Sequence, residues 1–98
     1  MERLFAVTRS RGVGWNNSRP MEDQQDWQSH AAFMNALEAD GFVLLGGPLE
    51  GTTDVLLIVR ASNAEQIRSR LSADPWTRND LLRISQVVPW ALRLGSLG

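Results

Sequence analysis

The sequence predicts an α+β fold with the element order β-α-β-β-α-β and a four-stranded antiparallel sheet, the split arrangement of ferredoxin-like folds. Short apolar, β-prone runs alternate with two segments of helical periodicity, and turn residues separate each run from the next. The chain has 98 residues, which suffices for one hydrophobic core but not for two. Residues 1–98 are therefore expected to form a single domain.

The N-terminal half is expected to hold a strand, a loop and a helix. Residues 3–9 are apolar and β-prone and predict the first strand. Residues 10–20 are rich in Gly, Asn and Ser and predict a loop, which is long enough for a lid or a binding element. Residues 21–40 predict a helix whose acidic first turns suit the positive end of the helix dipole. Its apolar face consists of Trp27, His30, Met34 and Leu37, with Phe33 beside them, and Gly41 follows as the stop.

The remaining strands are apolar on both faces. Residues 42–45 and 54–60 predict two strands, the first ended by Gly46-Gly47-Pro48, and residues 82–94 predict the last, where Pro89 indicates an edge or a bulge. Two helices cover only one face of a four-stranded sheet, so the second apolar face needs a partner. We expect a homodimer with sheet packed on sheet, a dimeric α+β barrel. The alternative is a monomer whose N-terminal loop covers the open face.

The segment between the last two strands carries two helix-start signals. Asn63 is suited to cap a second helix that buries Ile67 and Leu71. Asp74 and Pro75 then open a short helical turn, as N-cap and first helical residue.

The composition excludes several classes of function. A net charge of −1 provides no basic field for nucleic acid or an anionic membrane. The absence of Cys and the presence of one His exclude disulfides, thiolate chemistry and a multi-His metal site within one chain. The longest apolar run, residues 55–59, is far too short to span a membrane. The first residues do not resemble a signal peptide, so we expect a cytoplasmic protein, and no motif indicates a cofactor.

His30 is the residue most suited to proton transfer, because histidine exchanges protons near neutral pH. Its place on the apolar helix face turns it inward, where it needs a hydrogen-bond partner, and Asp74 is the candidate. Two interpretations stay open. His30 is a structural histidine and Asp74 only a cap, or the carboxylate orients the imidazole and leaves its second nitrogen as a general base.

Other residues are candidates for binding a ligand beside this pair. Gly46-Gly47-Pro48 allows close approach to the backbone and oxyanion binding by N–H groups, but such a triplet also ends strands. Arginines flank the 10–20 loop and suit a carboxylate, although surface solvation explains them equally. Tryptophans suit a pocket wall, although packing explains most of them. These residues are Arg9, Arg11 and Arg19, and Trp15, Trp27, Trp76 and Trp90.

Four segments carry a resemblance to a known family. They are Trp27-Gln28-Ser29-His30-Ala31-Ala32-Phe33-Met34, the stretch from Asp40 to Leu49 with its Gly-Gly-Pro triplet, Arg70-Leu71-Ser72-Ala73-Asp74-Pro75-Trp76, and Val88-Pro89-Trp90. In this order they resemble the YCII-related (YciI-like) family over nearly the whole chain.

The resemblance implies a dimeric ferredoxin-like α+β barrel and a His–Asp pair in a pocket. His30 matches the family's helix histidine, Asp74 its Asp-Pro aspartate, and Gly46, Gly47 and Pro48 its turn. The family includes a dehydrochlorinase-type lyase of chlorinated aromatic compounds, and its fold is shared with small isomerases and cofactor-free monooxygenases. The loop with Trp15 looks like a subgroup feature, so the lyase's substrate is not carried over.

Two functions therefore compete. The first is a cofactor-independent lyase or isomerase in which His30 moves a proton on a small carbonyl or hydroxyaromatic acid. The second is a non-catalytic module that binds a small molecule in the same pocket. A purely structural dimer would have no cavity around His30.

Overall fold

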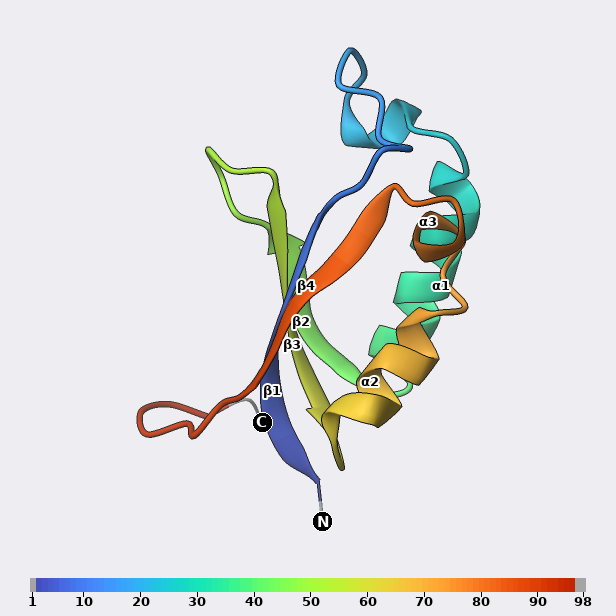
Figure 1. Ribbon diagram of the computed structural model, residues 1–98. Helices are drawn as coiled ribbons and strands as arrows, with labels where there is room; N and C mark the ends of the chain where they lie inside the picture. Colours follow the sequence, from blue (N-terminus) through green and yellow to red (C-terminus); the bar gives the residue numbers. More distant parts are fainter. Residues whose placement is uncertain (1, 97–98) are drawn as a thin grey trace.

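The computed structural model describes residues 2–96 of the chain. In this part of the chain, four strands and three helices follow one another, and a short 3-10 helix, η1, precedes the longest helix (Figure 1). The elements are β1 (Arg3–Arg11), η1 (Met21–Asp23), α1 (Trp27–Ala39), β2 (Val43–Pro48), β3 (Asp54–Ala61), α2 (Ala64–Leu71), α3 (Pro75–Arg78) and β4 (Leu82–Pro89).

The strands form one antiparallel sheet in the order β2-β3-β1-β4. The helices α1, α2 and α3 all lie on one side of this sheet, as Figure 1 shows. This arrangement confirms the predicted α+β class and the β-α-β-β-α-β order, with α3 as the short turn after the second helix. The two central strands, β3 and β1, pair along almost their whole length and carry the core.

The main core fills the space between the sheet and the helices. Alternate residues of β1 and β3 point into it, and Val7 and Val59 at its centre are fully buried. From α2 come Ile67 and Leu71, which are also fully buried, as the sequence predicts. The side chain of Asn63 accepts a hydrogen bond from the Gln66 N–H at 2.8 Å, so the predicted cap of α2 is present.

Several element boundaries differ from the sequence prediction. The helix expected from residue 21 begins at Trp27. Residues 21–23 form η1 instead, and Asp26 takes a left-handed backbone conformation (φ 62°) that separates η1 from α1. The first strand continues to Arg11, and the last ends at Pro89 on an edge strand, where a missing N–H is tolerated.

The expectation that Gly46-Gly47-Pro48 ends the strand before it is wrong. The triplet belongs to β2 and pairs in register with β3, Gly46 opposite Leu57 and Pro48 opposite Val55. Neither Gly46 nor Gly47 has a positive φ, so both residues take ordinary extended backbone angles. Pro48 is the last residue of this edge strand, a position that proline tolerates.

The face of the sheet opposite the helices carries an apolar patch that the single chain leaves uncovered. A shallow hollow of about 230 Å³ on it is lined by Ala6, Leu56, Ile58, Val88, Pro89 and Trp90. The side chains of Val88 and Trp90 are 42% and 40% exposed. The predicted second apolar face is thus present as a patch on β1, β3 and β4 rather than over the whole sheet, and the homodimer inferred from it stays a prediction. None of the described helices combines the length and the apolar character of a membrane-spanning segment.

The 12–20 loop is held against the turn between α3 and β4. The N–H groups of Gly12 and Gly14 donate to the carbonyls of Leu81 and Asp80 at 2.9 and 2.8 Å. The contact is so close that a Cβ on Gly12 would collide with the Asp80 carbonyl oxygen. Glycine is therefore required there for close approach of two backbones.

Candidate active site

Asp74 is the N-cap of α3 and is completely buried. Pro75 occupies the first turn of this helix, and the Trp76 N–H donates to Asp74 Oδ1 at 3.0 Å. The local sequence thus fixes the carboxylate by two means, a proline that sets the helix start and a cap that orients the side chain.

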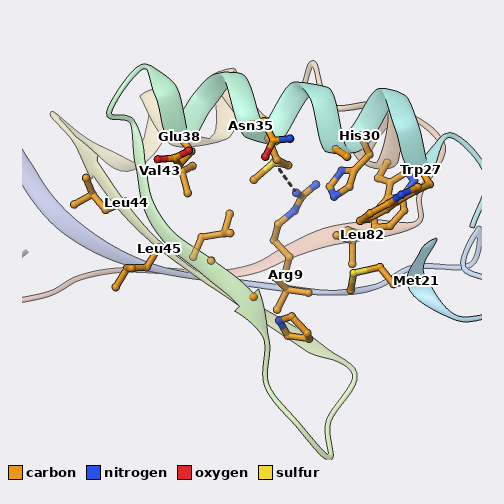
Figure 2. A pocket seen from close by; sticks show the side chains of 18 residues that line it. Arg9, Met21, Trp27, His30, Asn35, Glu38, Val43, Leu44, Leu45 and Leu82 are labelled. Atoms are coloured by element: carbon orange, nitrogen blue, oxygen red, sulfur yellow. Dashed lines mark hydrogen bonds between the residues drawn. The ribbon is translucent and has the colours of Figure 1, made fainter.

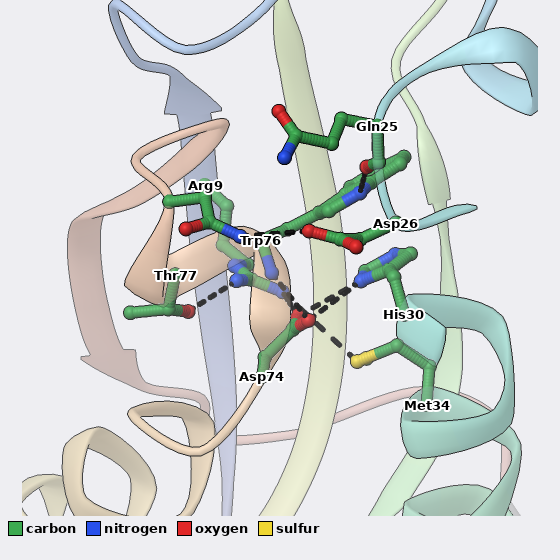
Figure 3. A network of polar contacts seen from close by, with 9 residues as sticks. Arg9, Gln25, Asp26, His30, Met34, Asp74, Trp76 and Thr77 are labelled. Carbon is green, nitrogen blue, oxygen red and sulfur yellow. Dashed lines mark hydrogen bonds and ion pairs between the residues drawn. The ribbon is translucent and has the colours of Figure 1, made fainter. Parts of the chain in front are cut away.

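His30 lies one turn into α1 and points across to Asp74 (Figure 3). Its Nδ1 is 2.9 Å from both carboxylate oxygens, Oδ1 and Oδ2. Because an ionised carboxylate only accepts hydrogen bonds, Nδ1 carries the proton and donates it. Within residues 2–96, no group hydrogen-bonds to Nε2, and the ring lines a cavity. The Asp74 carboxylate therefore serves both as the N-cap of α3 and as the hydrogen-bond partner of the His30 imidazole.

Trp76 holds the imidazole plane. The two rings are stacked, with centroids 3.8 Å apart and planes within 6° of each other. The indole N–H of Trp76 donates to the Gln25 carbonyl at 2.6 Å, which fixes the stacking surface in turn. Trp27 packs at an angle against both rings. The orientation of His30 is thus set by one hydrogen bond in its plane and one aromatic contact on its face.

Arg9 is a third charged member of the cluster. Its Nη1 lies 2.9 Å from Asp74 Oδ2, its Nη2 donates to Thr77 Oγ1 at 2.7 Å, and the residue is 1% exposed. The β1 alternation that buries Phe5 and Val7 also turns Arg9 toward the helices. This period-2 pattern was a usable signal in the sequence, because an arginine in phase with buried residues needs a buried anion.

The surroundings keep Asp74 ionised. Burial alone raises the pKa of its carboxyl, but the hydrogen bonds from His30 and from the Trp76 N–H, with the charges of His30 and Arg9, outweigh burial and bring the pKa below its usual range. Burial also lowers the pKa of Arg9, against the opposing effect of Asp74. Arginine pKa values lie so high that the guanidinium stays charged. The resting cluster is therefore a buried ion pair beside a histidine.

A cavity of about 560 Å³ opens beside His30, between α1 and β2 (Figure 2). Apolar side chains such as Met21, Met34 and Leu57 form much of its wall, while Asn35 and Glu38 lie at its exposed edge. A cavity of this size is typical of small-molecule sites. Among the described residues, no cluster of His, Asp and Glu side chains is suited to hold a metal ion.

The structure gathers most of the residues predicted to bind a ligand. Besides His30, the cavity wall includes Arg9, Trp27, Gly46, Gly47, Pro48 and Trp76. Trp15 does not line the cavity; it packs edge-on against Trp76, with ring centroids 5.3 Å apart, and the Arg11 guanidinium lies 4.5 Å from its ring centre. Trp15 thus contacts Trp76 from outside the cavity.

The fold and the site define a small α+β protein in which a buried Arg–Asp–His cluster adjoins an apolar cavity. The model of the YCII-related domain matches residues 7–91, so the chain belongs to the YCII-related family.

Among solved structures, the chain is similar to 5-chloro-2-hydroxyhydroquinone dehydrochlorinase from Burkholderia phenoliruptrix AC1100, in complex with 2,5-dihydroxybenzoquinone. The two share 24% sequence identity over 94% of this chain and 95% of that chain, with a TM-score of 0.56. This likeness supports the fold. No curated protein matches the chain.

Proposed function

We propose that the protein is a cofactor-independent lyase or isomerase in which His30 is the general base and Asp74 orients it. One observation carries the proposal. His30 donates from Nδ1 to a fully buried carboxylate, and its ring borders a cavity large enough for a small molecule. A carboxylate behind one imidazole nitrogen fixes the tautomer in which the other nitrogen accepts a proton.

In the proposed reaction, the free Nε2 takes a proton from a carbon next to a carbonyl or from a hydroxylated ring. The bonding electrons move into an enolate or phenolate oxygen, and the negative charge of Asp74 stabilises the imidazolium. Return of the proton to another carbon completes an isomerisation, while loss of a leaving group with its electron pair completes an elimination, after which the imidazolium releases its proton to the departed anion or to water. General acid–base catalysis of this kind contributes about 10²–10⁴-fold to the rate.

The β2 edge offers the means to stabilise the oxyanion. Gly46 and Gly47 line the cavity, and β2 is an edge strand of the sheet. Edge strands leave some N–H groups unpaired with a neighbouring strand, and such groups suit a developing negative charge. The triplet thus allows a ligand to approach the backbone closely.

A small cyclic substrate suits the cavity better than a long or highly charged one. The wall is mainly apolar, and the charge of Arg9 is already balanced by Asp74. The similar dehydrochlorinase holds a dihydroxybenzoquinone. We therefore propose a small carbonyl compound or a hydroxylated ring as the substrate class, and do not assign a carboxylate clamp to Arg9.

We also propose that the chain acts as a homodimer through the uncovered sheet face. The apolar side chains of that face would be buried by a second copy, sheet on sheet. Light scattering after gel filtration tests this: we expect a dimer for the wild type and a monomer for Leu56→Asp. A monomeric wild type at micromolar concentration would refute the dimer. A cytoplasmic location stays a prediction from the sequence.

Incubation with a panel of hydroxylated quinones and cyclic ketones, followed by mass spectrometry, tests the reaction. His30→Ala should abolish turnover while circular dichroism and oligomeric state stay unchanged. Gln28→Ala, on the exposed side of the same helix, is the matched control and should keep full activity. Conversion of a substrate by His30→Ala at the wild-type rate would show that His30 is not the base.

The second candidate function is binding without chemistry. It is favoured by the small exposed fraction of His30, 8%, which restricts the access of a reacting atom to the imidazole while the rest of the cavity can hold a ligand. A binding module would give ligand-dependent shifts in NMR spectra and return every ligand chemically unaltered.

A further inference from the structure

We propose that Arg9 is a positioning residue whose guanidinium offsets the negative charge of the Asp74 carboxylate and thereby holds His30 in its neutral, proton-accepting form at neutral pH. The importance of this role for catalysis rests on the proposed function. The proton equilibrium itself can be measured without a substrate, so the two proposals can fail separately.

The geometry of Asp74 is the first argument. Its two oxygens accept hydrogen bonds from three different residues: the Trp76 N–H, His30 Nδ1 and Arg9 Nη1, each within 3.0 Å (Figure 3). The carboxylate is entirely shielded from solvent. A buried carboxylate with only a histidine beside it would draw a proton onto that histidine, because the pair needs one positive charge for neutrality. Arg9 supplies that charge.

The donors of Arg9 are the second argument. Nη1 is committed to Asp74 and Nη2 to Thr77, while the sulfur of Met34 lies 4.0 Å from Nη1. Nε is buried and has no hydrogen-bond partner. The guanidinium therefore does not offer the cavity the pair of parallel N–H groups with which arginine binds a ligand carboxylate. Its arrangement fits a fixed counter-ion inside the protein.

The third argument is the charge around His30 from each neighbouring element. Asp74 faces it from α3 and Arg9 from β1, while β2 contributes no ionisable side chain. On α1, Glu38 lies two turns away at the cavity edge, and Asp26, before the helix, accepts a hydrogen bond from Asn79. Arg9 and Asp74 sum to zero, so a proton on His30 leaves a net charge of +1 in a buried cluster. Burial disfavours that state.

The chain contains one histidine, so the imidazole proton signals in an NMR titration belong to His30 alone. Replacing Arg9 by Met removes the charge and keeps an unbranched apolar stem. The His30 titration midpoint in Arg9→Met is expected to lie ~1 pH unit or more above the wild-type midpoint, because an opposite charge beside a buried group has an effect of this order. Arg9→Lys keeps the charge and should bring the midpoint most of the way back.

Thr77→Val is the matched control, since it removes one hydrogen bond from Arg9 and no charge; its midpoint should stay near that of the wild type. A folded Arg9→Met chain with an unchanged or lower midpoint would overturn the proposal. If Arg9→Met does not fold, the proposal is tested on the wild type by following the NMR chemical shift of the Asp74 carboxyl carbon. It should keep its ionised chemical shift through the His30 titration, and a carboxyl that takes up the proton in that range would overturn the proposal. If turnover is found, the acid limb of the rate profile should move to higher pH in Arg9→Met.

Discussion

Two ion pairs in this protein have the same length and opposite surroundings, which allows a direct test of what burial does to an aspartate. Asp74 and Arg9 are 2.9 Å apart and almost completely shielded, with side-chain exposures of 0% and 1%. Asp40 and Arg70 are also 2.9 Å apart, but their side chains are 60% and 37% exposed. We compare Asp74→Asn with Asp40→Asn, which remove the same charge and keep the same shape.

Asp74→Asn should lower the free energy of unfolding by about 3–5 kcal/mol, because it leaves the Arg9 charge buried without its counter-ion. Asp40→Asn should lower it by about 0–1 kcal/mol, since water solvates both groups when the pair is broken. For a chain of this size, about 1 kcal/mol corresponds to roughly 4–8 °C in Tm. Thermal and urea unfolding followed by circular dichroism measure both. Equal losses for the two variants would refute the reasoning.

The direction of the Asp74 pKa shift adds a pH signature. The pKa of this carboxyl is lower in the folded chain than in the unfolded one, because the hydrogen bonds and charges around it outweigh the effect of burial. Its contribution to stability is therefore fully present above the unfolded pKa, ~3.9, and is lost as pH falls through the lower folded pKa. The stability gap between wild type and Asp74→Asn should be constant near neutrality and should narrow below about pH 4. A gap that widens on acidification would contradict the pKa direction.

Three further outcomes are expected. Gly12→Ala should destabilise the chain by about 1–3 kcal/mol in urea unfolding, because its Cβ would meet the Asp80 carbonyl, whereas Gly47→Ala has open space and should be neutral or slightly stabilising. Asn63→Ala should cost about 1 kcal/mol of unfolding free energy through the lost cap of α2, and an unchanged urea midpoint would show that the cap is dispensable. Trp76→Leu should broaden or shift the single imidazole signal of His30 in NMR spectra, since the stacked ring is gone; an identical signal would mean that the stack does not orient it.

Local sequence signals predicted the elements of the fold well. The cap at Asn63, the Asp74-Pro75 helix start and the edge position of Pro89 depend on neighbouring residues only, and all three are present. The helix start at Trp27 was missed because the left-handed backbone of Asp26 leaves no mark in hydrophobic periodicity.

The site was harder to predict, because its charge balance depends on a contact between distant segments. His30 and Asp74 were paired on their chemistry and on the family resemblance, and the structure brings them within hydrogen-bond distance. Arg9 was predicted to bind a ligand carboxylate. The sequence shows which side of β1 Arg9 occupies, but it does not show that the carboxylate on that side belongs to Asp74. Its hydrogen bond to Asp74 spans 65 positions along the chain, and no local pattern encodes such a distance.

The backbone hydrogen bonds of Gly12 and Gly14 have a consequence for how a ligand reaches the cavity. A loop held by two backbone hydrogen bonds is poorly suited to move as a lid, so access of a ligand to the cavity should not depend on opening of the 12–20 loop. In the proposed reaction, substrate and product would occupy the same cavity, so steady-state kinetics should show the product acting as a competitive inhibitor.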